Sequence, residues 1–281
     1  MSTPPFLKLP GCVRAVRVAG LAALRGEPAG PVRGTALLVP GFTGSKEDFI
    51  ALLEPLAEAG FRTVAVDQRG QYESGGSADP EAYSVRALGA DVRALSAELA
   101  AAGGPLHLLG HSFGGQVVRE AVLSASGDLP WESLTLMSTG PGAIDPAEAA
   151  RTGLLLSALE SMDLESIWQV MQQMEGERVP PLPPEIAEFL HRRWVANDPR
   201  ALKAMAAHLV AAPDRVDELA AAGLRTLVLS GERDYAWPVP EQSRMAERLG
   251  ALRTVVAGAG HSPNAERPAE TAAALAAFWA A

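Results

Sequence analysis

The hydrophobic residues of this chain fall into short uninterrupted runs that alternate with longer stretches in which they recur every three or four positions. A short apolar run bounded by glycine or proline is typical of a buried strand, and the longer period is typical of an amphipathic helix. The runs predict strands at residues 13–18, 21–25, 35–39, 61–67, 106–109, 133–138, 224–230 and 252–257. The helical spacing predicts helices at residues 46–59, 84–101, 238–249 and 265–280. This order predicts an α/β fold, in which a mostly parallel central sheet carries helices on both faces.

The alternation stops between residues 144 and 212, where no convincing strand pattern occurs. Two apolar faces with helical spacing lie in this block, the first made of Leu164, Ile167, Trp168, Met171 and Met174, the second of Ile186, Phe189, Leu190 and Trp194. Turn signals separate them, and the proline-rich stretch 179–184 predicts a stiff linker. We therefore predict an all-helical cap at residues 144–212, inserted into an α/β core made of residues 1–143 and 213–281.

The composition narrows the class of protein. With 281 residues, 48% of them hydrophobic, the chain can form one large α/β domain with a buried core. Its net charge of −9 and the lack of a basic cluster argue against nucleic acid and anionic membrane as partners. No stretch of about 18 uncharged apolar residues appears, so we expect no membrane span. The single cysteine, Cys12, allows no intrachain disulfide, and the first ten residues lack the pattern of a secretory signal. These features predict a cytoplasmic protein and leave its oligomeric state open.

Residues 110–114 read Gly-His-Ser-Phe-Gly, between the strand predicted at 106–109 and a helical stretch that starts near residue 116. A strand, a tight turn and a helix make up a nucleophile elbow, which holds its serine in a strained backbone conformation. Only small residues tolerate the close approach of strand and helix in such a turn. The pattern therefore predicts that Ser112 is a nucleophile exposed at the end of a strand.

A serine hydroxyl needs a neighbouring base, and one histidine falls in a loop directly after a predicted strand. That residue is His261, in the sequence Gly-Ala-Gly-His, and catalytic groups of an α/β sheet gather at the ends of strands. The other histidines lie in a strand, in the elbow and in predicted cap helices: His107, His111, His191 and His208. His261 is therefore the predicted base.

The base itself needs an acid to orient it, and position alone leaves three candidates. Glu232 and Asp234 follow the strand predicted at 224–230, and Asp145, after the strand predicted at 133–138, is an outside alternative. The spacing from the strand does not choose between them.

The chain resembles the α/β-hydrolase fold family over nearly its whole length outside residues 144–212. That family has a Gly-x-Ser-x-Gly elbow and orders its triad serine, acid, histidine. Its acid usually lies in a Gly-x-x-Asp pattern with a proline a few residues later, and Gly231, Asp234 and Pro238 match that pattern. Its histidine usually ends a Gly-x-Gly-His pattern, as His261 does. The resemblance therefore implies a catalytic triad of Ser112, Asp234 and His261.

An oxyanion hole needs two backbone N–H groups aimed at the developing negative charge, and one should belong to Phe113, directly after the nucleophile. The family usually takes the second from a His-Gly-x-x-Gly-Ser loop after the first parallel strand. Residues 40–45 read Pro-Gly-Phe-Thr-Gly-Ser, so the resemblance implies Phe42 as the second donor, with proline in place of the histidine. The turn Asp-Gln-Arg-Gly at residues 67–70 resembles a family turn that holds the loop beside the active site.

Large apolar side chains in the predicted cap and beside the acid indicate an apolar substrate pocket: Trp168, Met171, Trp194 and Trp237. Equally, such residues can simply pack the cap against itself and the sheet. We predict a serine hydrolase that cleaves a carboxylic ester, or a related acyl bond, of a small, largely apolar substrate through an acyl-enzyme, with no cofactor and no metal.

Three other functions fit the same residues: a cofactor-free perhydrolase, a hydrolase of carbon–carbon bonds, and a small-molecule receptor without turnover. Ser112 excludes the alkyl-enzyme chemistry of members of this fold that carry aspartate at the elbow. A metal centre is not predicted, because two histidines four residues apart in a strand, His107 and His111, are separated by about 13 Å. No Walker sequence or complete dinucleotide-binding unit occurs.

Overall fold

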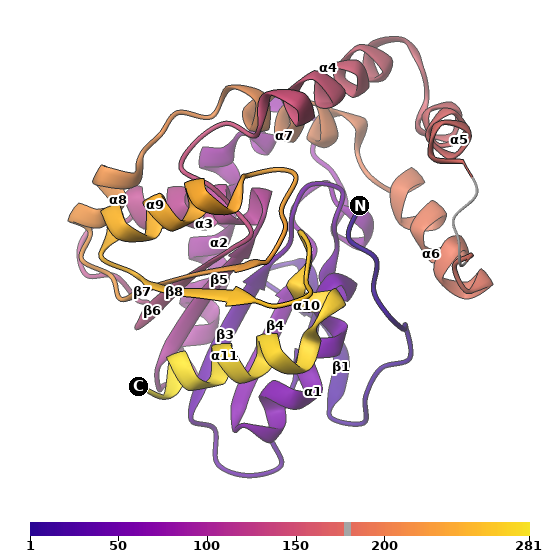
Figure 1. Cartoon of the computed structure of the whole chain (residues 1–281). Coiled ribbons are helices and arrows are strands. Elements are labelled where there is room, and N and C mark those ends of the chain that lie inside the picture. Colours follow the sequence, from indigo (N-terminus) through magenta and orange to yellow (C-terminus); the bar gives the residue numbers. More distant parts are fainter. Residues whose placement is uncertain (177–180) are drawn as a thin grey trace.

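A computed structural model describes residues 1–176 and 181–281, and one sheet of eight strands runs through its centre (Figure 1). The strands are β1 (Val13–Val18), β2 (Leu21–Gly26), β3 (Gly34–Val39), β4 (Phe61–Val66), β5 (Leu106–His111), β6 (Ser133–Met137), β7 (Thr226–Gly231) and β8 (Leu252–Val256). Their order across the sheet is β1-β2-β4-β3-β5-β6-β7-β8. β2 pairs antiparallel with β1 and β4, and all pairs from β4 to β8 are parallel. The predicted fold class is therefore confirmed.

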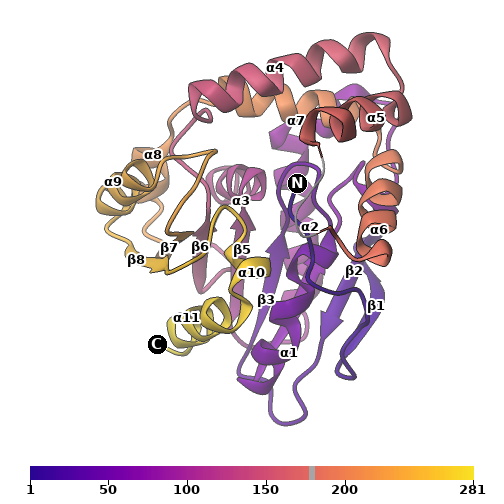
Figure 2. The same ribbon diagram turned by 45° about the vertical axis from the view of Figure 1, so that its right-hand side comes forward.

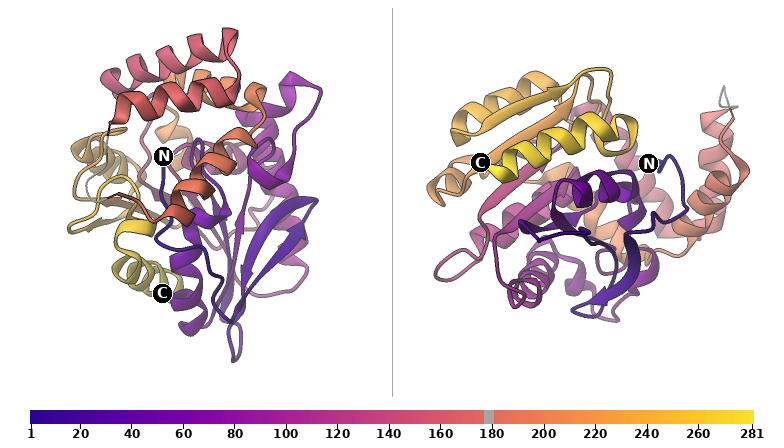
Figure 3. Two further views of the ribbon diagram at one scale, coloured as in Figure 1. Left: turned by 90° about the vertical axis from the view of Figure 1, so that its right-hand side faces the viewer. Right: turned by 90° about the horizontal axis from the view of Figure 1, so that it is seen from below.

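Helices cover both faces of the sheet (Figure 3). They are α1 (Ile50–Glu58), α2 (Val85–Ala100), α3 (Phe113–Leu123), α4 (Pro146–Ser161), α5 (Leu164–Glu175), α6 (Pro184–Val195), α7 (Pro199–Ala211), α8 (Val216–Ala221), α9 (Val239–Leu249), α10 (Pro263–Glu266) and α11 (Pro268–Ala280). Three short 3₁₀ helices are η1 (Lys46–Phe49), η2 (Tyr72–Ser74) and η3 (Pro80–Tyr83). Helices α1 and α11 pack on one face, and α2, α3, α8 and α9 pack on the other.

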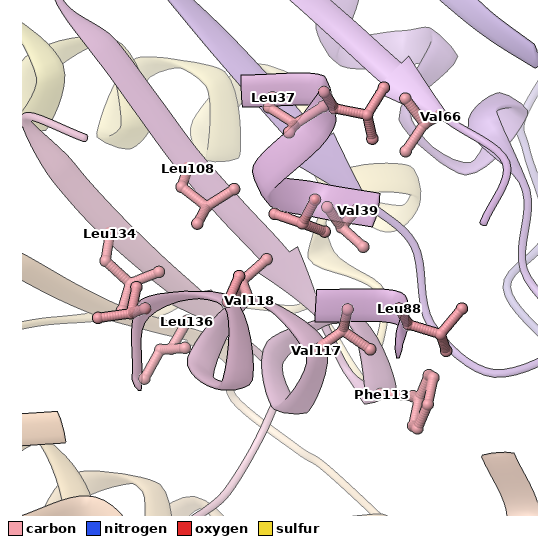
Figure 4. Close-up of a cluster of buried hydrophobic side chains, with 14 of the residues drawn as sticks. Leu37, Val39, Val66, Leu88, Leu108, Phe113, Val117, Val118, Leu134 and Leu136 are labelled. Carbon is pink, nitrogen blue, oxygen red and sulfur yellow. The ribbon is translucent and has the colours of Figure 1, made fainter. Parts of the chain in front are cut away.

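Alternating side chains along each strand build one hydrophobic core on each face of the sheet. In β3, Leu37 and Val39 belong to the core under α2 and α3, whereas Leu38 belongs to the core under α1 and α11. Figure 4 shows the first of these cores, in which Phe113 and Leu108 also take part. Burial on both faces explains why the central strands read as continuous apolar runs.

Helices α4 to α7 follow β6 and lie together beyond one end of the sheet (Figure 2). We call them the helical insertion, which begins at Pro146 and ends at Ala211. The predicted division of the chain into a core and a cap at residues 144–212 stays a prediction. Part of the predicted linker 179–184 lies outside the described residues, and α6 begins at Pro184. In the described ranges, no helix is long and apolar enough to cross a membrane.

Two predicted helices are each divided in the structure, and one short helix was missed. The helix predicted at 265–280 consists of α10 and α11, separated at Arg267, because the residue before a proline is pushed out of the helical region. The helix predicted at 46–59 starts as η1 and continues as α1. Helix α8 has only six residues, too few for a periodic pattern to reveal.

Candidate active site

The turn between β5 and α3 has the geometry that the sequence predicts. Ser112 alone separates the strand from the helix, and it has φ 54° and ψ −122°, a strained conformation for a residue other than glycine. A side chain at Gly110 would collide with the carbonyl of Gly114, and one at Gly114 would collide with the carbonyl of Val39. The two glycines therefore allow strand and helix to meet tightly enough to hold Ser112 in this conformation.

Three side chains from separate parts of the chain meet at this turn. The Ser112 hydroxyl lies 3.0 Å from Nε2 of His261, and Nδ1 of His261 lies 2.9 Å from Oδ1 of Asp234. His261 follows β8 and Asp234 follows β7, so both come from loops at the carboxyl ends of parallel strands. With a proton on Nδ1 donated to Asp234, Nε2 of His261 is free to accept the serine proton.

The side chain of Asp234 is wholly buried and surrounded by hydrogen-bond donors. Its Oδ1 accepts from the N–H groups of Ala236 and Trp237 as well as from His261, and its Oδ2 accepts from Nε2 of Gln242 at 2.9 Å. Burial by itself raises the pKa of Asp234, but the hydrogen bonds and charge of His261 and the two backbone N–H groups outweigh it and lower the pKa below its ordinary value. Asp234 is therefore a carboxylate near neutral pH.

The loop that carries His261 is held on both sides. The carboxylate of Glu266 accepts hydrogen bonds from the N–H groups of Gly260 and Ser262, which flank the histidine. His111 donates its Nε2–H to the carbonyl of His261 at 2.9 Å. Burial and the neighbouring His261 lower the pKa of His111 to about 3, so it stays neutral and keeps this donor.

The other candidate acids and His107 do not take part in this hydrogen-bonded set. Glu232 accepts from the N–H of Gly258, and Asp145 caps the start of α4 by accepting from Ala147. Position in the sequence left these acids open, and the hydrogen bond to His261 distinguishes Asp234 from both. His107 lies inside β5, hydrogen-bonded to Ser133.

Gln242 and Glu266 were missed in the sequence. Gln242 lies on the buried side of α9, and Glu266 is the last residue of the short α10. Each acts on a neighbour that only the folded loops bring within reach. No pattern in the sequence distinguishes them from an ordinary helical glutamine or glutamate.

The backbone N–H groups of Phe42 and Phe113 have no acceptor in the hydrogen bonds of the described residues. Phe113 is the first residue of α3, where the N–H groups of a helix lack intrahelical partners. The loop of Phe42 is braced by two buried amides, because Gln68 donates to the carbonyl of Pro40 and Gln71 to that of Gly41. Both amides come from the turn that follows β4. This turn therefore supports the loop beside Pro40, the position at which the family usually has a histidine.

A cavity of about 670 Å³ opens above Ser112 and His261, between the sheet and the helical insertion. Of the four side chains predicted to line a pocket, Met171 and Trp194 line this cavity, whereas Trp168 and Trp237 do not. Trp237 is wholly buried and donates its indole N–H to the carbonyls of Gly142 and Ala143. For these two tryptophans the predicted placement was wrong.

Trp168 turns toward α6, where its ring lies 5.3 Å from that of His191. It packs there against Phe189 and its neighbours as part of the insertion's own core. Asp48, which also reaches the cavity, is paired with Arg193 at 2.6 Å. Among residues 1–176 and 181–281, no three histidine, cysteine, aspartate or glutamate side chains gather as they would around a metal ion.

Comparison with known proteins gives consistent matches. A model of the Alpha/beta hydrolase family matches residues 36–274. The fold is similar to that of a thermophilic esterase from Thermogutta terrifontis, with a TM-score of 0.72 and 23% identity over 94% of this chain and 97% of that one. It is also similar to a bromoperoxidase from Bacillus anthracis, with a TM-score of 0.74 and 17% identity over 96% of this chain and 100% of that one. A membrane phospholipase A described as a bacterial virulence factor matches with a TM-score of 0.69 and 26% identity, over 95% of this chain and 84% of that one.

Proposed function

Since this chain belongs to the alpha/beta hydrolase family and is a hydrolase, we propose that it cleaves carboxylic esters through a covalent intermediate on Ser112. One observation carries the proposal: the hydrogen bonds of 3.0 Å from Ser112 to His261 and of 2.9 Å from His261 to Asp234. A nucleophile, a base in contact with it and an acid that orients the base are what acyl transfer by serine requires. The esterase among the similar structures supports the choice of ester as the bond.

In the proposed reaction, Oγ of Ser112 attacks the ester carbonyl while Nε2 of His261 takes the hydroxyl proton. Asp234 stabilises the imidazolium that forms, and the N–H groups of Phe42 and Phe113 bind the negative charge on the carbonyl oxygen. His261 then gives its proton to the departing alcohol, which leaves an acyl group on Ser112. Water, deprotonated by His261, releases the carboxylic acid and restores the serine.

We assign the helical insertion the role of a cap that covers the reaction site. The insertion contributes Met171, Trp194 and Leu155 to the cavity wall, and these side chains favour an apolar substrate. A covered site also excludes bulk water, which strengthens the contacts to the oxyanion. The cytoplasmic location stays a prediction.

Hydrolysis of p-nitrophenyl butyrate by the purified chain tests this proposal. We expect turnover by the wild type and none above background by Ser112→Ala. Asp234→Asn should lower kcat by roughly 10⁴-fold, because the wrong tautomer of His261 then faces the serine. Glu232→Gln is the matched control, since Glu232 follows the same strand without touching His261, and its turnover should stay within a factor of two of the wild type.

The same assay separates two of the other candidate functions, the perhydrolase and the receptor. Addition of peroxide and bromide tests for a perhydrolase, a possibility kept open by the fold of the bromoperoxidase from Bacillus anthracis. A receptor without turnover would bind an ester and release it unchanged. A large loss in Glu232→Gln together with a mild one in Asp234→Asn would mean that the acid has been assigned wrongly.

A further inference from the structure

One face of α4 follows the cavity for almost the full length of the helix. The residues of this face recur every three or four positions and continue one residue past the helix end, at Glu148, Arg151, Thr152, Leu155, Ala158 and Met162. At 1.5 Å per residue, the stretch from Glu148 to Met162 extends about 21 Å. The space above Ser112 is therefore an elongated groove that follows the helix.

The wall of this groove changes from polar to apolar along its length. Its polar end carries the ion pair of Glu148 and Arg151 and lies at the active site, because the N–H of Asp145, just before α4, donates to the carbonyl of Ala236 in the loop of Asp234. Past Thr152 the lining residues of α4 carry no polar side chain.

Helix α5 supplies the facing wall at the far end with an entirely apolar face, Ile167, Val170, Met171 and Met174. On the side opposite this polar end, apolar side chains extend from the active site to α5. Phe42, next to Ser112 in the cavity lining, packs in the same hydrophobic cluster as Trp194, Ile167 and Met171. The buried carboxylate in this region, Asp48, is engaged by Arg193, so it offers a substrate no free charge. A hydrocarbon chain that runs along this side contacts mainly apolar side chains.

The far end of the groove is lined by adaptable side chains and is open to solvent on one side. Three of its side chains are methionines, whose unbranched thioethers adapt to ligands without a fixed shape: Met162, Met171 and Met174. Leu154 is 67% exposed and Met174 is 76% exposed although both line the cavity. Apolar side chains left in water at a cavity mouth gain free energy when a ligand covers them.

We propose that the substrate is an ester with a long, unbranched hydrocarbon chain, which lies along α4 and α5 while the ester group is held at Ser112. This inference rests on the proposed function and specifies its substrate class. A flexible chain fits a groove with methionine walls, and the polar start of α4 lies where the ester group and the other half of the substrate would be. The inference holds whether this hydrocarbon chain belongs to the acid part or to the alcohol part of the ester.

The rate of hydrolysis as a function of chain length tests the inference. With p-nitrophenyl esters from acetate to dodecanoate, each below its critical micelle concentration, kcat/KM should rise by up to about fourfold per added methylene until the groove is filled, the factor that corresponds to about 0.8 kcal/mol. Ethyl octanoate and octyl acetate then distinguish an acyl chain from an alkyl chain in the groove. A maximum at acetate or butyrate would overturn the inference.

Two variants of the groove wall and one control test where the hydrocarbon chain of the substrate lies. Met171→Glu places a charge in the far wall, and Gln172→Glu places the same charge on the same helix at a position outside the cavity lining. We expect Met171→Glu to lower kcat/KM for the decanoate at least tenfold more than it lowers kcat/KM for the acetate, while the control leaves the ratio of the two unchanged. Ala158→Trp should act in the same way by filling the groove without adding a charge.

Several results would contradict the inference. One is an equal loss of kcat/KM for short and long esters in variants whose melting temperature is unchanged. Another is a rate of hydrolysis that increases only when the long esters form micelles. The second result would assign the exposed apolar residues to contact with the aggregate. If no ester of any length is hydrolysed, the proposed function fails, whereas turnover without chain-length dependence overturns only the inference about the chain.

Discussion

The side-chain amide of Gln242 donates a hydrogen bond of 2.9 Å to Oδ2 of Asp234, and both side chains are wholly buried. A second hydrogen bond, also 2.9 Å, ties the same nitrogen to the carbonyl of Trp237 and fixes its position. In the described part of the chain, Gln242 is the side chain that binds the carboxylate oxygen turned away from His261. It acts on the reaction through Asp234, so it is a positioning residue.

We expect Gln242→Leu to lower kcat by roughly 10- to 100-fold with little change in KM, because a hydrogen bond to a charged group is worth about 1.5–3 kcal/mol. Without this donor the charge of Asp234 is less stabilised, and the carboxylate holds the proton of His261 more strongly. The acid limb of the pH–rate profile should therefore shift upward, by up to about one pH unit.

Met245→Ala is the control for a merely structural effect. Met245 is buried on the same helix, so its truncation should destabilise the protein by about 2–5 kcal/mol. Its pH–rate profile should match that of the wild type. A Gln242→Leu profile that also matches the wild type would show that Gln242 serves packing alone.

A buried ion pair connects the helical insertion to the rest of the protein. Arg193 of α6 and Asp48 of η1 are each 0% exposed and lie 2.6 Å apart. Arg193→Met or Asp48→Asn should each destabilise the protein by about 3–5 kcal/mol, because the remaining partner is left unpaired.

A double-mutant cycle in urea measures the coupling within this pair. The double variant should lose less than the sum of the two single losses. The exposed pair of Lys203 and Glu160 is the matched control, and Lys203→Met should change stability by less than about 1 kcal/mol. Additive losses for Arg193 and Asp48 would mean that they stabilise the insertion independently.

The sequence predicts the sheet well because burial on both faces leaves a strong signal. Three of the residues 106–109 are leucines and only His107 interrupts them, and the structure extends this strand only to His111. The turn around Ser112 is predictable for a related reason, since steric crowding admits only glycine at 110 and 114. Local chemistry thus specifies these parts before the chain is folded.

The lining of the cavity depends on contacts that helical spacing cannot resolve. Trp168 shares the apolar face of α5 with Met171, but that face is wide enough to meet both the cavity and α6. Trp237 was expected at the cavity because it follows the loop of Asp234, yet its indole N–H binds backbone carbonyls after β6. A pattern shows which residues are buried together, and only the fold shows which of them face a ligand.

The buried side chain of His107 should make the stability of the folded protein depend on pH. Burial, with a smaller effect of the positive Arg225, lowers the pKa of His107 from 6.5 to about 4. Between these two values the unfolded chain binds a proton that the folded protein does not, so stability falls as the pH falls. The loss is up to about 1.4 kcal/mol per pH unit and is absent above pH 6.5.

His107→Gln tests this effect, because glutamine keeps a polar partner for Ser133 and does not titrate. Between pH 7 and pH 5, the variant should lose about 2 kcal/mol less stability than the wild type in urea unfolding. Equal losses would mean that His107 already takes up its proton in the folded protein.

Covalent labelling of Ser112 tests the central claim most directly. A fluorophosphonate reacts only with a serine made nucleophilic by its surroundings, so peptide mapping by mass spectrometry should find one adduct, on Ser112. His261→Ala should slow the labelling by orders of magnitude, and Ser112→Ala should abolish both the adduct and ester hydrolysis. An adduct on another serine, or turnover that persists in Ser112→Ala, would contradict the account.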